Sequence, residues 1–103
     1  NSITEGIGSS RVTKNFGQAP IDDAYSINDT DALSVLFELL EKEGLNLGTS
    51  SGINIAGAIK LAENLGPNKT IVTVLCDTSD KYRSKMFNKK FLTDKGLPFP
   101  KWL

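Results

Sequence analysis

Residues 48–52 (Gly-Thr-Ser-Ser-Gly) combine the residue types and the spacing of a ligand-binding turn. They lie between a short apolar stretch, residues 45–47, and a helix-like run, residues 53–65. The first N–H groups of a helix have no partner within it, and serine and threonine hydroxyls donate and accept hydrogen bonds without carrying charge. Such a turn suits a polar group or a ring nitrogen as well as an anion. The same residues also fit an ordinary strand-to-helix connection, in which serine caps the helix and glycine permits a tight backbone.

The composition excludes several kinds of site and partner. The chain has 103 residues, 39% hydrophobic and 23% charged, which is typical of one small globular domain. Lys and Arg number 12, as do Asp and Glu, so net charge favours neither nucleic acid nor an anionic membrane. The absence of histidine and the single cysteine, Cys76, exclude a Cys/His zinc site, a Ser-His-Asp triad and an internal disulfide. No apolar run is long enough to span a bilayer.

Hydrophobic periodicity predicts two main helices. The first covers residues 30–43, and Gly44 suits its C-terminal cap in a left-handed conformation. Its apolar face has the i, i+3, i+4, i+7 spacing of Leu33, Leu36, Phe37 and Leu40. The second covers residues 53–65 and is stopped by Gly66-Pro67. Around them we expect strands over residues 24–27, 45–47 and 70–76, helical turns over residues 80–86 and 89–95, and irregular structure over residues 1–20.

The order of these elements predicts an α/β fold with a mainly parallel sheet and flanking helices. Residues 70–76 (Thr-Ile-Val-Thr-Val-Leu-Cys) are β-branched and almost continuously apolar, as in a strand covered on both faces, and Cys76 is expected to be buried there. The chain offers too few strands to surround it, so we expect it to belong to a larger sheet. Ligands of open α/β sheets bind beyond the carboxyl ends of strands, where residues 48–52 and Asp77-Thr78 both fall.

Five motifs occur in one order along the chain: residues 5–8 (Glu-Gly-Ile-Gly), 43–52, 74–77 (Val-Leu-Cys-Asp), 82–85 (Tyr-Arg-Ser-Lys) and 95–98 (Lys-Gly-Leu-Pro). Together they resemble the carboxyl-terminal third of cysteine synthase, O-acetylserine sulfhydrylase, from the β-family (fold type II) of pyridoxal-phosphate enzymes. The resemblance covers almost the whole chain. It implies that residues 1–103 are the C-terminal part of the large cofactor-binding domain, incomplete as a domain by themselves.

The resemblance also assigns site residues. It implies that Ser50 donates a hydrogen bond to the pyridine nitrogen of pyridoxal 5'-phosphate, and that Gly6 approaches the cofactor through its backbone. It places Ile7 and Gly8 in the lining of the cleft. Three further residues are expected in the cleft or behind the ring: Thr49, Asp77 and Thr78. Departures from the family pattern, such as Ser79 where glycine is usual, affect the fine geometry around the ring.

The family's cofactor-binding lysine and phosphate loop lie in its amino-terminal part, and neither has a match in this chain. We therefore expect no catalytic residue and no metal site here, and no activity of the chain alone. The resemblance implies an intact enzyme that makes cysteine from O-acetylserine and sulfide. The alternatives are a cystathionine β-synthase-type enzyme, or an inactive cysteine-synthase-like protein with a binding or regulatory role.

The expected partners are the missing amino-terminal part of the same enzyme, a second copy in a homodimer, and a small amino-acid substrate. Because the chain starts at Asn1 rather than Met, we expect that the native start has been removed. The expected location is cytoplasmic, with a mitochondrial one as the alternative.

Overall fold

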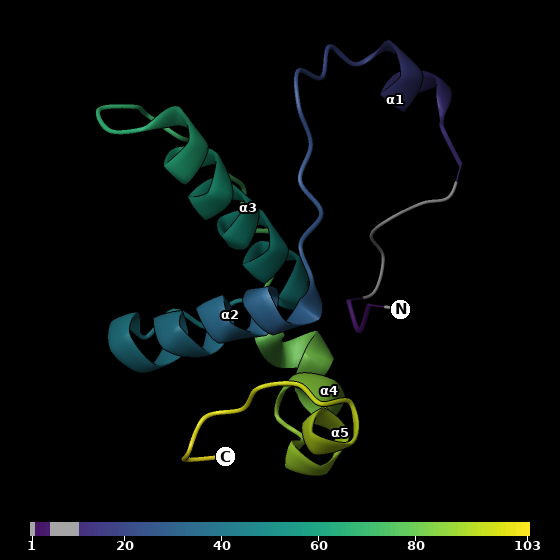
Figure 1. Cartoon of the computed structure of the whole chain (residues 1–103). Helices are drawn as coiled ribbons and strands as arrows, with labels where there is room; N and C mark the ends of the chain where they lie inside the picture. Colours follow the sequence, from purple (N-terminus) through teal and green to yellow (C-terminus); the bar gives the residue numbers. More distant parts are fainter. Residues whose placement is uncertain (1, 5–10) are drawn as a thin grey trace.

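The computed structural model describes residues 2–4 and 11–103, and two crossing helices dominate it (Figure 1). Helix α2 covers Asp29–Glu43 and helix α3 covers Thr49–Leu65. A 3-10 turn, η1 (Ser79–Tyr82), and two short helices, α4 (Arg83–Met86) and α5 (Lys89–Asp94), pack beneath α2. No helix in the described part of the chain is long and apolar enough to cross a membrane.

Helix α2 confirms the predicted helix almost to the residue. The Asn28 side chain accepts the Asp31 N–H at 2.8 Å and caps the first turn. At the other end, Gly44 has a φ of +67° and its N–H bonds to the carbonyl of Leu40. Leu33 and Phe37 on the predicted apolar face are buried.

Helix α3 begins about one turn earlier than predicted, at Thr49 rather than Ile53. Residues 48–52 are therefore not a separate connection before the helix but its N-cap and first turn. Gly48 is the N-cap residue, with φ −80° and ψ 172°, and it has no side chain with which to cap the helix. Threonine, serine and glycine are poor helix formers in the middle of a helix but are acceptable in its first turn. The N–H groups of the first turn have no partner within the helix whatever the residue type.

The two helices cross closely because Gly52 has no side chain. A Cβ at residue 52 would lie 2.7 Å from the Ala32 carbonyl oxygen and 2.7 Å from Leu36 Cγ. Ala56, one turn further along α3, is also buried. The core continues below this crossing, where Tyr82, Met86 and Leu92 from the short helices join the apolar face of α2.

The C-terminal tail packs on the same core. Trp102 lies edge-on to Phe37, with ring centroids 6.3 Å apart, and Phe87 contacts both rings. The tail is non-helical, as its prolines predict. The predicted helix over residues 80–86 is divided into η1 and α4, because Tyr82 has φ −117° and ψ 14° at the junction.

The predicted parallel sheet is not observed: none of the described residues is in a strand. Residues 24–27, 45–47 and 70–76 are instead unpaired, and a strand requires a hydrogen-bonded neighbour. Val72, Val74 and Leu75 are 88%, 65% and 51% exposed, and Cys76 is exposed rather than buried. These residues by themselves therefore do not form the predicted sheet.

One helix was not expected. Helix α1 covers Lys14–Gln18, inside the segment predicted to be irregular, and the Thr13 hydroxyl accepts the Phe16 N–H at its start. It buries no residue, and it lies away from the crossing of α2 and α3 (Figure 1).

Candidate functional site

The start of α3 lies against the end of the extended segment, residues 70–76, so the two predicted parts of the site are adjacent. The Gly48 N–H donates to the Asp77 carbonyl at 2.8 Å. The Ser51 hydroxyl accepts the Cys76 N–H at 2.9 Å. These two bonds connect positions far apart in the sequence and fix the first turn of α3 beside Asp77.

The three hydroxyl residues of this turn differ in burial. Thr49 is 2% exposed and Ser51 is fully buried, whereas Ser50 is half-buried. Successive residues of a helix point about 100° apart, so Ser50 cannot face the interior together with both neighbours. Within the described part of the chain, the Ser50 hydroxyl has no hydrogen-bond partner. Of the three, Ser50 is therefore the residue whose hydroxyl is both partly exposed and without a partner among the described residues.

Two buried polar atoms at this position lack partners among the described residues: Thr49 Oγ1 and Asp77 Oδ1. The other carboxylate oxygen, Asp77 Oδ2, accepts the Tyr82 hydroxyl at 2.9 Å. Buried polar atoms are usually hydrogen-bonded in folded proteins. Thr49 Oγ1 and Asp77 Oδ1 are therefore exceptions to this rule among the described residues.

Tyr82 is a residue of this site that sequence reasoning missed. It is 8% exposed, and its ring lies beside Gly48, because a Cβ there would be 2.8 Å from Tyr82 Cε2. Its position five residues after Asp77, across the turn η1, brings the hydroxyl back to the carboxylate. A tyrosine in an otherwise polar stretch was the available signal.

The other predicted residues have different outcomes. Thr78 is exposed and is the N-cap residue of η1, but its side chain does not cap the helix: its hydroxyl donates to the Asp80 side chain at 3.3 Å. Gly6, Ile7 and Gly8 lie outside the described residues. No group of three or more metal-binding side chains occurs in the part of the chain that the structure describes.

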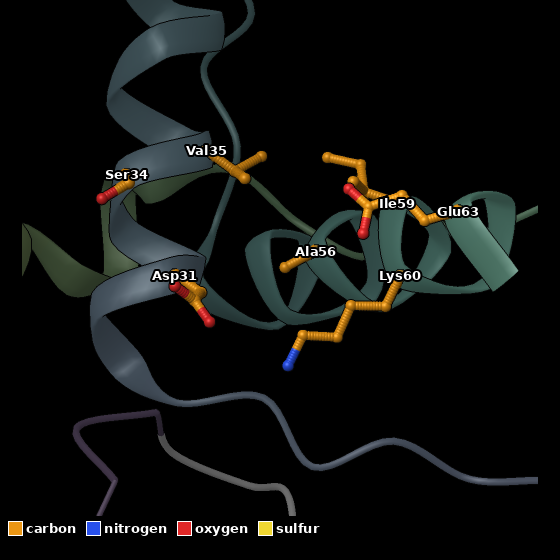
Figure 2. Close-up of a pocket in the computed structure, with 7 residues that line it drawn as sticks. All are labelled: Asp31, Ser34, Val35, Ala56, Ile59, Lys60 and Glu63. Carbon is orange, nitrogen blue, oxygen red and sulfur yellow. The ribbon is translucent and has the colours of Figure 1, made fainter.

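A pocket of about 290 Å³ lies in the angle between α2 and α3 (Figure 2). Its charged groups are Asp31 from α2 and Lys60 and Glu63 from α3. None of its lining residues belongs to residues 48–52 or to Asp77-Thr78, so it is separate from the candidate site.

Comparison with known proteins identifies the class. The family model for pyridoxal-phosphate dependent enzymes matches residues 1–77, and the chain belongs to this family. Pyridoxal phosphate is the cofactor of the family, and the resemblance drawn from the sequence motifs is confirmed.

Curated relatives narrow the similarity to cysteine synthases. The chain is 43% identical to the cysteine synthase of Dictyostelium discoideum over 93 residues, covering 90% of this chain and 25% of that protein. It is 40% identical to cysteine synthase 1 of Neurospora crassa over 99 residues, covering 94% of this chain and 26% of that protein. An O-acetylserine dependent cystathionine beta-synthase of Bacillus subtilis is 38% identical over 82 residues, covering 80% of this chain and 27% of that protein.

A solved structure agrees with the curated relatives. The crystal structure of a hydrogen sulfide-producing enzyme with an α-aminoacrylate intermediate aligns with a TM-score of 0.59 and 40% identity, covering 68% of this chain and 21% of that one. The chain spans about a quarter of the length of the curated relatives that it matches.

Proposed function

We propose that residues 1–103 are the C-terminal part of the large cofactor-binding domain of a pyridoxal-phosphate enzyme that makes cysteine from O-acetylserine and sulfide. The similarity to cysteine synthases over 90% of the chain supports this, as does the match to the family model. The chain is incomplete as a domain in this proposal, and the rest of the same enzyme is its first partner.

The observation that carries the proposal is the Ser50 hydroxyl, half-buried at the start of α3 and without a partner in the described residues. In the proposal it donates to the pyridine nitrogen of pyridoxal 5'-phosphate. In the proposal the Thr49 hydroxyl, which has no partner among the described residues, is a second donor of this turn toward the cofactor. Gly6 approaches the cofactor, and the cleft is completed by Ile7, Gly8, Asp77 and Thr78.

The cofactor, when bound, supplies an electron sink for negative charge that develops on the substrate. A serine hydroxyl is too weak an acid to protonate the pyridine nitrogen, so it keeps that sink milder than a carboxylate partner would. A mild sink favours elimination and replacement at the β-carbon of an amino-acid substrate. Ser50 thereby sets the reaction type without taking part in bond breaking.

The lysine that carries the cofactor belongs to the rest of the enzyme in this proposal. No lysine of the described residues is buried. A lysine that forms a Schiff base needs a lowered pKa, which desolvation or a neighbouring cation provides. The chain by itself would accordingly have no activity.

The exposed apolar side chains of residues 70–76 are explained by the same proposal. Val72, Val74 and Leu75 would be covered when these residues form one strand of a mainly parallel sheet whose other strands come from the rest of the enzyme. A homodimer and an amino-acid substrate complete the expected partners. A cytoplasmic or mitochondrial location agrees with a single cysteine and no internal disulfide.

The test uses the full-length enzyme that contains this chain, loaded with pyridoxal phosphate. We expect it to form cysteine from O-acetylserine and sulfide. The rate with homocysteine in place of sulfide is measured for comparison. Ser50→Asp should protonate the pyridine nitrogen, change the visible absorption of the cofactor and slow the reaction. An unchanged spectrum and rate in Ser50→Asp would remove Ser50 from the site.

A second candidate function is that of a cystathionine β-synthase-type enzyme, which the Bacillus subtilis relative favours. It shares the proposed site and differs in the nucleophile that adds to the β-carbon. A higher kcat/KM with homocysteine than with sulfide would replace the first proposal with this one.

A further inference from the structure

Ser51, in the first turn of α3, forms its side-chain hydrogen bond with a distant segment and not with its own helix. Its side chain is fully buried, and its hydroxyl accepts the N–H of Cys76, 25 residues later, at 2.9 Å. A serine at this place commonly bonds to the backbone of its own helix. Here the hydroxyl accepts a backbone N–H, as the carbonyl of a neighbouring strand would, and so attaches the end of residues 70–76 to α3.

A second bond acts beside the first. The Gly48 N–H donates to the carbonyl of Asp77 at 2.8 Å. The two bonds join Gly48, the N-cap of α3, to Asp77 and Ser51, in its first turn, to Cys76. Ser50 lies between Gly48 and Ser51, which these two bonds hold in place. The backbone at Ser50 is therefore held too, and with it the direction of the Ser50 Cα–Cβ bond.

The Asp77 side chain is also held in place, by contacts with Tyr82. Asp77 accepts the Tyr82 hydroxyl at 2.9 Å, and the ring of Tyr82 leaves no space for a side chain at residue 48. The end of the extended segment therefore cannot shift toward α3 or away from it without breaking a hydrogen bond or a packing contact.

We propose that Ser51 is the positioning residue of this site, which aims the Ser50 hydroxyl at the pyridine nitrogen by holding the first turn of α3 onto Cys76. Ser51 touches neither cofactor nor substrate and acts through Ser50. The inference rests on the proposed function, because the direction of Ser50 matters only if its hydroxyl meets the cofactor.

The experiment compares variants of the full-length holoenzyme loaded with pyridoxal phosphate that is labelled with ¹⁵N in the ring. The ¹⁵N chemical shift of the pyridine nitrogen reports its hydrogen bond directly and needs no turnover. Ser50→Ala should move this shift toward the value of a nitrogen without a donor. Ser51→Ala should move it in the same direction by a smaller amount, with kcat lowered about tenfold because the donor is misplaced rather than removed.

A control is available at Thr93, in α5 and outside this turn. Its hydroxyl forms one hydrogen bond with backbone, as that of Ser51 does, by donating to the Lys89 carbonyl at 2.8 Å. Thr93→Ala removes that hydroxyl and should leave the ¹⁵N shift unchanged.

The double variant Ser50→Ala/Ser51→Ala distinguishes a positioning role of Ser51 from a role in stability alone. If Ser51 acts through Ser50, adding Ser51→Ala to Ser50→Ala should leave the ¹⁵N shift and kcat where Ser50→Ala alone put them, while stability still falls. If Ser51→Ala does not fold, Ser51→Cys keeps a similar shape with a weaker acceptor and should show part of the ¹⁵N shift.

The outcomes distinguish the inference from the function on which it rests. A ¹⁵N shift that is unchanged in both folded Ser51 variants, with a clear effect of Ser50→Ala, overturns the positioning role alone. Additive effects in the double variant overturn it as well. No effect of Ser50→Ala overturns the proposed cofactor contact and the inference with it.

Discussion

Gly48 and Asp77 are in contact through both backbone and side chain. The Gly48 N–H donates to the Asp77 carbonyl at 2.8 Å, and the Asp77 carboxylate occupies the space that a Cβ at residue 48 would need. The same Cβ would lie 2.8 Å from Tyr82 Cε2 and 3.0 Å from the Thr78 carbonyl oxygen. The start of α3 can therefore lie this close to Asp77 only with glycine at residue 48.

Gly48→Ala should destabilise the full-length enzyme by about 1–3 kcal/mol, because backbone and the half-buried Asp77 carboxylate would have to move. The measurement is urea denaturation of the apoenzyme. The matched control is Gly57→Ala on the same helix, where a Cβ would meet only Ile27 Cγ1, at 3.9 Å. Alanine should there be neutral or stabilising by up to about 1 kcal/mol. Equal effects of the two substitutions would contradict the tight contact at Gly48.

Thr49→Val should separate cofactor affinity from stability. The Thr49 hydroxyl is buried with no partner among the described residues, so valine, of similar shape, should leave the stability of the apoenzyme unchanged or slightly higher. If the hydroxyl bonds to the cofactor, affinity for pyridoxal phosphate should fall about tenfold.

Fluorescence titration of the apoenzyme with pyridoxal phosphate measures the effect of Thr49→Val. The control is Thr93→Val, because the Thr93 hydroxyl donates to the Lys89 carbonyl in α5, outside the site. Unchanged cofactor affinity in Thr49→Val would show that this hydroxyl does not contact the cofactor.

Tyr82→Phe should cost about 1–3 kcal/mol of unfolding free energy. The substitution removes the O–H that donates to Asp77 Oδ2 and leaves a partly buried carboxylate with fewer donors. Thermal and urea unfolding of the apoenzyme give the value. Tyr25→Phe serves as the control: its hydroxyl accepts from Asn64 at 2.6 Å in an exposed position, so the loss should stay within about 0.5 kcal/mol. A larger loss at Tyr25 than at Tyr82 would refute the assigned role.

The Glu38–Lys42 ion pair gives a pH-dependent prediction. The hydrogen bond from Lys42 Nζ to Glu38, together with the charge of that carboxylate, raises the pKa of Lys42 above its ordinary value of 10.5. A pKa that is raised in the folded state stabilises the fold below the unfolded pKa, and this contribution is lost as the pH rises through the folded pKa.

The difference in stability between the wild type and Lys42→Gln should therefore be constant well below pH 10.5 and be lost as the pH rises through the raised, folded-state pKa of Lys42. Because both side chains are exposed, the difference should be small and should shrink with added salt. Denaturation series at several pH values, repeated at high salt, measure it. A difference that grows with rising pH would have the wrong sign.

Sequence reasoning was most successful where a local pattern was sufficient. The spacing of Leu33, Leu36 and Phe37 predicted the buried face of α2, and Gly44 marked its end. Helix periodicity and a left-handed cap are properties of adjacent residues, so they can be read without knowing what lies opposite. The family motifs likewise predicted the class of enzyme, which the comparisons confirm.

The arrangement around the candidate site was predicted only where it concerns which segments are adjacent. The sequence indicated that residues 48–52 and Asp77 belong to one place, and the Gly48–Asp77 hydrogen bond brings them together. It did not indicate the role of Ser51 or the contact of Tyr82 with Asp77, because both depend on residues distant in the chain.

The sequence by itself thus determined helix α2 with both its ends, the C-terminal end of α3 and the family, because these depend on neighbouring residues and on motifs within this chain. The tertiary structure alone decided where α3 begins, which hydroxyl of its first turn is engaged by another segment, and whether residues 70–76 form a strand. Each of these depends on a partner from another segment: a strand exists only beside a second strand, and a serine is free or engaged only according to what the fold places next to it.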